Sequence, residues 1–451
     1  MKKYFIFIIS LFVFTGCDTF YTPTQSTIEA EEESSQAINN EYIDTIADDT
    51  TVNTNVARVP HTKSSIPMLG ILISYDNIQI RSSASTWSTK LFGTNDHQLN
   101  GYFKEVSNSK FQIARATESD GAINDGIVSV QLNYEHPNTN IDFSTFSSNV
   151  YPDLKDALIA IDSKIDFSNY DENADGSITP DELLLTFIIA GYEDSYEGRH
   201  VTNGIWAHQY CMSDSNTPAL DGVKLMGCRD DGNFALFGEL HDVANPHDAT
   251  IGIIAHELGH SAFSLPDLYN TNGTNGGIGY FGLMGAGTWG VQDRREYPGN
   301  TPTHFSAWSK VYNGWVTPTE ASGTTYLQTT SSDSYNIIKI PISANQYYLL
   351  ENRDNSGYDR GLYILEGVFD GGMAIWHINE DKLTESYFAN NTVNADTSEK
   401  GVDLVEAANA TIDYGGAGDE KALFYHLNVD AFGTKVTNIS SRGPSMTLNI
   451  N

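Results

Sequence analysis

Residues 250–263 read TIGIIAHELGHSAF, and the spacing of their apolar side chains predicts a buried helix. Five apolar residues recur three or four positions apart and would form one stripe: Ile251, Ile254, Ala255, Leu258 and Ala262. A helix with such a stripe packs against a core and leaves its other faces for polar side chains. The polar residues of this helix are therefore the first candidates for chemistry.

Two histidines and a glutamate stand on this helix. His256 and His260 are four residues apart, so they share one face and their imidazoles can hold one ion. Glu257 lies one position round the helix, where its carboxylate reaches a water bound to that ion. Zinc lowers the pKa of such a water, and a carboxylate can take its proton. The pattern predicts a zinc hydrolase with Glu257 as general base; a structural helix with two histidines is the alternative.

A methionine follows the helix in a small-residue turn. Residues 280–290 read YFGLMGAGTWG, with Met284 between small residues. A methionine turn beneath the metal is a feature of metzincins. The prediction for Met284 is support of the site without contact to substrate, and plain core packing is the alternative.

Several stretches together resemble the immune inhibitor A-type metallopeptidases. They read HELGH at 256–260, LPDLY at 265–269, GLMGAGTW at 282–289 and TPTHFSAWSKVYNGWVTP at 301–318. The resemblance extends over residues 66–451, through YYLLENRDNSGYDR, GGMAIWHINE and KGVDLVEA. It implies a secreted bacterial zinc endopeptidase with a metzincin-like α/β catalytic domain.

The third zinc ligand is where this chain departs from that family. Members of the family read HExxHxxGxxD, whereas HSAFSLPD here places one extra residue between His260 and Asp267. Phe263 stands at the place of the family's glycine, whose freedom at positive φ helps the chain turn back. The resemblance implies that Asp267 is the third ligand. A bulge could absorb the extra residue, because Ser264 and Pro266 both favour leaving a helix. A downstream glutamate is the alternative, with Asp267 then capping the turn.

A second ion site is predicted at residues 171–182, which read DENADGSITPDE. Oxygen-bearing side chains occupy positions 1, 3, 5, 7 and 12 of an EF-hand-like loop: Asp171, Asn173, Asp175, Ser177 and Glu182. Gly176 falls at the tight turn. The apolar run LLLTFIIAGY that follows favours a buried strand over the exiting helix of a calcium sensor. The loop is therefore predicted to bind a structural Ca²⁺, with an acidic surface turn as the alternative.

The start of the chain predicts export. Lys2 and Lys3 precede the apolar run YFIFIISLFVF, and Gly16 precedes Cys17. This pattern is typical of a bacterial lipoprotein signal, so residues 1–16 are predicted to be the signal and Cys17 the lipidated residue. An ordinary cleaved signal is the alternative. Residues 17–60 lack apolar density and are predicted to be a flexible acidic tether, or else a short pro-segment.

Charge and cysteine usage fit an exported protein. Of 451 residues, 58 are acidic and 25 basic, so the net charge of −33 argues against nucleic acid or an anionic membrane surface as partner. Besides Cys17, only Cys211 and Cys228 are present, and an oxidising compartment favours a disulfide between them. Two free buried thiols are the alternative.

The sequence thus predicts an α/β metzincin-like zinc protease domain with an embedded calcium loop at 61–322. Short alternating runs then predict a β-rich, sandwich-like domain at 323–451. The predicted function is extracytoplasmic hydrolysis of peptide bonds in protein substrates, on a bacterial membrane lipoprotein at its periplasmic or cell-surface face. Two other functions stay open: a non-catalytic calcium-stabilised surface or adhesion lipoprotein on a protease scaffold, and a zinc hydrolase for non-peptide amides or esters.

Overall fold

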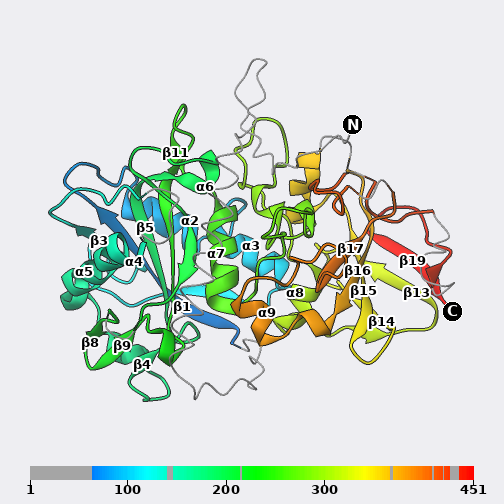
Figure 1. Cartoon of the computed structure of the whole chain (residues 1–451), viewed down its shortest axis with the longest axis horizontal. Helices are drawn as coiled ribbons and strands as arrows, with labels where there is room; N and C mark the ends of the chain where they lie inside the picture. The colour runs from blue at the N-terminus through cyan, green and yellow to red at the C-terminus, as the bar shows by residue number, and fades with distance from the viewer. Residues whose placement is uncertain are drawn as a thin grey trace, which may run out of the picture.

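The structure, a computed structural model, describes residues 63–139, 146–213, 216–365, 369–408, 411–419, 421–426 and 436–451. The predicted signal and tether, including Cys17, lie outside the described residues. Within those residues, no helix is both long enough and apolar enough to cross a membrane. Figure 1 shows a helix-rich half that carries the blue-to-green segments, and a β-rich half that carries the yellow-to-red segments.

The helix-rich half is built on an eight-stranded sheet. Its strands are β1 (Ser65–Ser74), β2 (Gln112–Arg115), β3 (Ile127–Gln131), β5 (Leu184–Glu193), β6 (Gly204–Ile205), β7 (His208–Tyr210), β10 (Phe234–His241) and β11 (His247–Asp248). The central strands β10, β5 and β1 run parallel, and β2 and β3 pair in parallel with β1. The buried strand predicted for LLLTFIIAGY is β5, and β1 carries a second apolar run, MLGILISY, which also predicts a buried strand. Their continuous apolar runs are typical of strands covered on both faces.

Helices cover the two faces of this sheet. They are α2 (Ala84–Phe92), α3 (Leu99–Val106), α4 (Phe146–Asn149), α5 (Tyr151–Ile161), α6 (Asp194–Glu197) and α7 (Ile251–Phe263). The helix α8 (Ala307–Tyr312) packs instead against the five-stranded sheet of the β-rich half. Alternate residues of β1 face different clusters, since Met68 packs with α2, α3 and α7 while Leu69 packs with α5. The mixed α/β architecture predicted from the sequence is confirmed.

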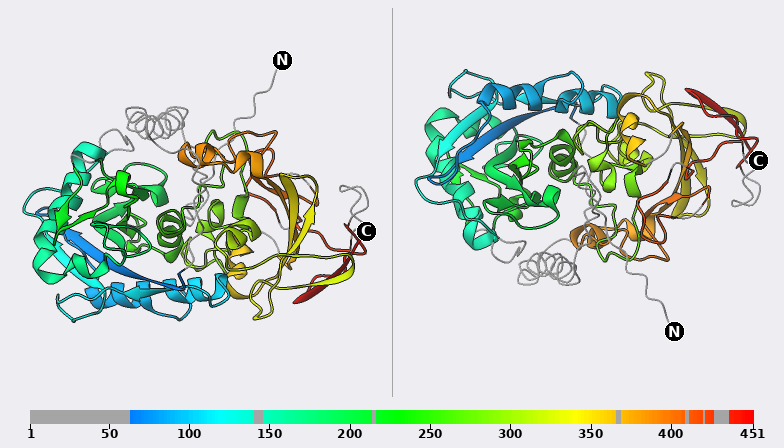
Figure 2. Two further views of the ribbon diagram at one scale, coloured as in Figure 1. Left: turned by 90° about the horizontal axis from the view of Figure 1, so that it is seen from below. Right: turned by 90° about the horizontal axis from the view of Figure 1, so that it is seen from above.

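The helix α7 is the predicted helix of residues 250–263, and it lies in the middle of the molecule. Figure 2 shows this green helix end-on, between the sheet of the helix-rich half and the strands of the β-rich half. The five predicted stripe residues are all buried, but so is every other residue of α7 except the half-buried His260. The prediction of one buried face was therefore too narrow, because the helix is enclosed by both halves.

The β-rich half contains two sheets. The five-stranded sheet consists of β12 (Thr319–Glu320), β14 (Ile338–Pro341), β15 (Gln346–Arg353), β16 (Gly372–Asn379) and β17 (Val402–Val405). The three-stranded sheet consists of β13 (Gly323–Gln328), β18 (Val436–Thr437) and β19 (Ser445–Ile450). Leu327, Met446 and Leu448 from the smaller sheet share one hydrophobic cluster with Ile338, Leu350 and Ile375 from the larger. The two sheets therefore pack against each other through apolar faces.

The hydrophobic core continues past residue 322. One cluster joins Leu258 of α7 to Leu349, Trp376 and Leu404 of the five-stranded sheet. The short helix α9 (Glu385–Ala389) also belongs to the β-rich half. The two halves therefore share one core around the helix that carries the histidines.

Candidate metal centre

His256 and His260 are held on α7 by hydrogen bonds to backbone carbonyls. Nδ1 of His256 lies 3.0 Å from the carbonyl oxygen of Leu283, and Nδ1 of His260 lies 2.6 Å from that of Leu265. A carbonyl only accepts, so each Nδ1 carries the hydrogen, and each Nε2 is left with a lone pair. The two Nε2 atoms are 3.2 Å apart.

Asp267 meets both imidazoles. Its Oδ1 lies 3.0 Å from Nε2 of His256 and 3.3 Å from Nε2 of His260. The side chain is buried, and among the described residues Oδ1 has no hydrogen-bond partner. His256, His260 and Asp267 are the only group of three potential metal-binding side chains that converges within the described part of the chain.

The donor set fits zinc. Three lone-pair donors that face one another repel unless a cation lies among them, and donors on a tetrahedron about 2.0–2.1 Å from zinc are roughly 3.3–3.4 Å apart. The three donor separations here are 3.2, 3.0 and 3.3 Å. Two imidazoles and one carboxylate also leave a fourth position open, as in catalytic zinc sites.

The electrostatics of the three side chains reflect this crowding. Burial alone would raise the pKa of Asp267, but the adjacent His260 and His256 hold that pKa well below its usual range. Burial alone would lower the pKa of His260, but the attraction of the Asp267 carboxylate is larger than this effect, so the pKa of His260 is raised. The carboxylate therefore stays ionised and available as a ligand.

The turn that leads to Asp267 falls one residue after the place of the family's glycine. The helix α7 continues to Phe263, and Ser264 is the residue in the left-handed region, with φ 53° and ψ 31°. The N–H of Leu265 then reaches back to the carbonyl of Gly259 over 3.2 Å. Ser264, and not Phe263, therefore takes the left-handed conformation that suits the family's glycine. Asp267 follows Ser264 by three positions, which is the family's spacing from glycine to aspartate.

Ser264→Gly is expected to stabilise the protein. A left-handed conformation costs a non-glycine residue roughly 1–2 kcal/mol, while glycine loses roughly 0.5–1 kcal/mol more chain entropy on folding. The expected gain is about 0.5–1 kcal/mol in the free energy of unfolding, measured by urea titration. Ser264→Ala is the control, since it keeps the backbone strain. A glycine variant no more stable than the alanine variant would contradict this account of the turn.

Glu257 is buried beside the two histidines. Burial raises the pKa of its carboxyl to about 8; His256 opposes the shift, and the carboxylates of Asp267 and Glu193 add to it. A bound dication would lower this pKa again, because positive charge favours the carboxylate. Glu257 is not one of the three converging donors. Its position next to them suits a proton acceptor better than a ligand.

Met284 packs directly beneath the histidine helix. A Cβ at Gly259 would lie 2.5 Å from Sδ of Met284, so only glycine at this position of α7 allows the contact. The amide of Leu268 donates to the carbonyl of Met284 over 2.7 Å. The methionine turn therefore contacts both the helix that carries two donors and the loop that carries the third.

Sequence reasoning missed two residues that orient the donors. The Thr288 hydroxyl donates to the carbonyl of Leu283 over 2.7 Å and lies 3.1 Å from Nδ1 of His256. Asn391, which is 124 residues from Asp267, binds that residue through both ends of its amide. Thr288 stands in the quoted GLMGAGTW stretch, whereas no local pattern marks Asn391.

The predicted calcium loop forms a tight acidic turn with Gly176 at φ +85°. Asp171 accepts hydrogen bonds from the amides of Asp175 and Gly176, at 3.1 and 3.0 Å. The buried Glu182 carboxylate closes the loop by accepting from the amides of Glu172 and Thr179, at 2.9 and 3.0 Å. The carboxylates of Asp171 and Glu182 thus accept hydrogen bonds from amides of the loop itself.

The predicted disulfide is confirmed and lies beside this loop. Cys211 and Cys228 are bonded. The strand β9 (Val223–Leu225) lies within the closed segment and pairs with β4 (Ser177–Ile178) and β8 (Ala219–Leu220). The disulfide therefore anchors the strand against which the end of the acidic loop is paired.

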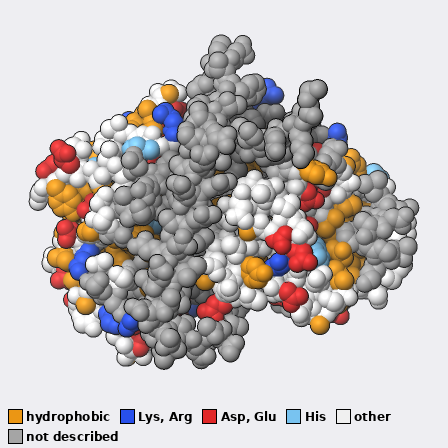
Figure 3. Space-filling view, viewed as in Figure 1, with side chains coloured by type: hydrophobic (Ala, Val, Ile, Leu, Met, Phe, Trp, Pro, Cys, Tyr) orange, Lys and Arg blue, Asp and Glu red, His pale blue; other side chains and the backbone are white. Residues whose placement is uncertain are grey.

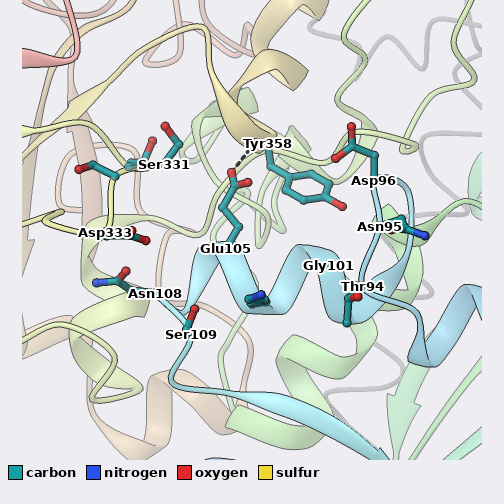
Figure 4. A pocket seen from close by; sticks show the side chains of 13 residues that line it. Thr94, Asn95, Asp96, Gly101, Glu105, Asn108, Ser109, Ser331, Asp333 and Tyr358 are labelled. Carbon is teal, nitrogen blue, oxygen red and sulfur yellow. Dashed lines mark hydrogen bonds between the residues drawn. The ribbon is translucent and has the colours of Figure 1, made fainter.

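A separate polar cavity of about 260 Å³ lies between α3 and the loop at 330–333. Figure 4 shows Glu105 on α3 and Tyr358 facing this cavity, with the Tyr358 amide donating to Glu105. None of the three converging donors lines it. Figure 3 shows separate groups of acidic side chains along the left edge of the visible face and to the right of its centre.

The mixed α/β architecture, the buried HExxH helix and the converging His–His–Asp set together form a candidate metal centre of the kind that metallopeptidases use. Residues 93–315 match the family described as the immune inhibitor A peptidase M6 catalytic domain. The resemblance found in the sequence is confirmed.

Two relatives illustrate the match. Immune inhibitor A of Bacillus thuringiensis subsp. alesti is 33% identical over 172 residues, which cover 35% of this chain and 24% of that protein. The pre-pro-metalloprotease PrtV of Vibrio cholerae serotype O1 (strain M66-2) is 29% identical over 195 residues, which cover 38% of this chain and 20% of that protein. The match thus spans about a quarter of the length of these relatives, or less.

Proposed function

We propose that this protein is a metzincin-like, zinc-dependent endopeptidase that hydrolyses peptide bonds of protein substrates. The observation that carries the proposal is the convergence of Nε2 of His256, Nε2 of His260 and Oδ1 of Asp267 at separations that suit tetrahedral zinc. The match of residues 93–315 to the peptidase M6 family and the name of the metalloprotease PrtV support the same conclusion.

Each residue has a defined task in the proposed reaction. His256, His260 and Asp267 would hold the ion, which when bound polarises the scissile carbonyl and acidifies water. The Glu257 carboxylate takes a proton from the attacking water and then gives it to the leaving amine nitrogen. Met284 supports the helix from below and does not touch the substrate.

The test is hydrolysis of casein by the purified chain, with and without a chelator, together with its zinc content. We expect about one zinc per chain, chelator-sensitive cleavage and recovery when zinc is restored. The competing function is a non-catalytic, calcium-stabilised surface or adhesion lipoprotein, which the altered spacing after His260 motivated. Stoichiometric zinc without any cleavage would favour that function over the endopeptidase.

We also propose that the acidic loop binds a structural Ca²⁺ through Asp171, Asn173, Asp175, Ser177 and Glu182. Its support is the EF-hand-like order of oxygen atoms around Gly176 and the closure of the loop by Glu182. The strand β4 leaves this loop to pair with β9, as a loop within the catalytic domain would.

Calcium is expected to raise the melting temperature of the wild type and to have little effect on Asp175→Asn. An ion that binds only the native state adds about 2.7 kcal/mol at a concentration of 100 Kd. Glu172→Gln is the matched control, because it removes the same charge from a non-ligand position whose side chain contacts Lys63 instead. If calcium does not change the melting temperature of the wild type, or changes that of both variants equally, the loop is only an acidic turn and not a calcium site.

Finally, we propose an extracytoplasmic protein anchored by lipid at Cys17. The support comes from the sequence of residues 1–17, which lie outside the described structure. The disulfide between Cys211 and Cys228 fits an oxidising compartment. Fractionation of cells that express the full chain and its Cys17→Ser variant tests the anchor.

A further inference from the structure

Asp267 is clamped by a residue of the β-rich half. The amide Nδ2 of Asn391 donates to Oδ2 of Asp267 over 2.6 Å, and the backbone N–H of Asp267 donates to Oδ1 of Asn391 over 3.0 Å. Only this amide orientation satisfies both bonds, because a backbone N–H donates and a carboxylate accepts. The clamp uses Oδ2 and leaves Oδ1 directed at the two histidines.

The backbone of Asn391 is held in place by contacts that do not involve Asp267. Its backbone is in the left-handed region, with φ 49°, which asparagine tolerates better than most residues. Its N–H donates to the carbonyl of Phe388, at the end of α9, over 3.0 Å. Its carbonyl accepts from the Thr271 hydroxyl over 3.1 Å. Figure 1 shows α9 beside the lower end of α7, where the loop with Asp267 begins.

The contact between Asn391 and Asp267 is one of several hydrogen bonds between the same two segments of the chain. Asn394 donates to the carbonyl of Leu268 over 2.9 Å. The side chain of Asn270 donates to the carbonyl of Ala395 over 3.3 Å, and Thr274 and Thr397 share a hydrogen bond of 2.9 Å. Residues 391–397 thus run along residues 267–275, which include the third donor. We call this segment, residues 391–397, the ligand strap.

We infer that Asn391 is a positioning residue for the third metal ligand, and that the ligand strap makes the β-rich half part of the metal centre. This inference rests on the proposed function in one respect, which is that the bound ion is zinc. Partners that orient a ligand typically change metal affinity by about 10- to 100-fold when they are removed. The strap supplies that orientation from outside the segment 93–315 that matches the peptidase family.

The test compares two isosteric variants of neighbouring asparagines in the full chain. Asn391→Asp keeps the acceptor for the Asp267 amide, loses the donor and places a second carboxylate against Oδ2. Asn390→Asp adds the same charge one residue away, where the side chain bonds only the carbonyl of Ser386 over 2.8 Å. The readouts are the zinc Kd, from competition of zinc alone with a chelator, and the melting temperature of the metal-free proteins.

We expect Asn391→Asp to weaken zinc binding by about 10- to 100-fold and Asn390→Asp by no more than about two-fold. Should Asn391→Asp fail to fold, Asn391→Gly keeps the left-handed backbone, removes the clamp and is expected to weaken zinc by about ten-fold. Equal zinc Kd values for the position-391 and position-390 variants would overturn this inference alone. A wild type and an Asn390→Asp variant that both bind no zinc would overturn the proposed function together with it.

Discussion

Glu257→Gln is expected to lower kcat/KM for casein hydrolysis by about 10²- to 10⁴-fold while zinc content stays at the wild-type value. The glutamine side chain has the same shape but cannot take a proton from water. The carboxylate lies on the same helix as two donors, yet it is not among the three atoms that converge. Removing it therefore leaves the ion bound and removes the proton acceptor.

Glu239→Gln is the control for this experiment. Glu239 is also a buried carboxylate, and burial raises the pKa of its carboxyl to about 7. Its Oε1 accepts from the amides of Arg81 and Ser82, at 2.7 and 2.9 Å, which an amide oxygen can still do. We expect near-normal activity from Glu239→Gln. Near-normal activity from Glu257→Gln as well would remove Glu257 from the mechanism.

The parts of the fold that local patterns specify were predictable. The strand β1, the strand β5 and the helix α7 each carry an apolar run or a helical period that matches their environment. The run ALFYHLNV at 422–429 is one of the short apolar runs from which the β-rich domain is predicted. Its described part forms only an isolated bridge between Phe424 and Met373. An apolar run predicts burial, whereas pairing depends on a partner strand elsewhere in the chain.

The residues of the metal centre also fall into those that local sequence patterns predict and those that they do not. His256, Glu257 and His260 follow from a spacing of four on one helix, and Asp267 follows from the resemblance to a family. Asn391 could not be predicted, because its contact with Asp267 joins residues that are 124 positions apart. The left-handed conformation of Ser264 could not be predicted either, because sequence spacing alone does not show at which residue the helix ends.

Buried charges explain how the β-rich half is held firmly against the metal centre. Arg353 pairs with Asp359 and donates to the carbonyl of Phe281 over 2.8 Å, while Lys310 pairs with Glu351 at 3.2 Å. All four charged side chains are fully buried. Such a network adds little net stability relative to apolar packing, but breaking it is costly because a lone buried charge remains. It therefore fixes one arrangement of the two halves, and with it the position of the ligand strap.

Asp267→Asn is expected to abolish tight zinc binding, with a loss larger than the 10- to 100-fold typical of a residue that only orients a ligand. Catalytic zinc sites generally use three protein donors, and this change removes the only anionic one. The amide would also be held in the wrong orientation. The Nδ2 group of Asn391 needs an acceptor, so the new amide oxygen would face Asn391. Its NH₂ group would then occupy the place of Oδ1 and point at the cation.

This variant and Glu257→Gln make a matched pair. Both replace a buried carboxylate near the histidines by an amide of the same shape, and both remove one negative charge. Only the asparagine variant should lose zinc, as measured by metal content after dialysis and by competition with a chelator. Proteolysis should fall in both, but added zinc should restore part of it only in Asp267→Asn. Full zinc occupancy and activity in Asp267→Asn would transfer the third-ligand role to another acidic residue downstream, and the clamp by Asn391 would then have no ligand to orient.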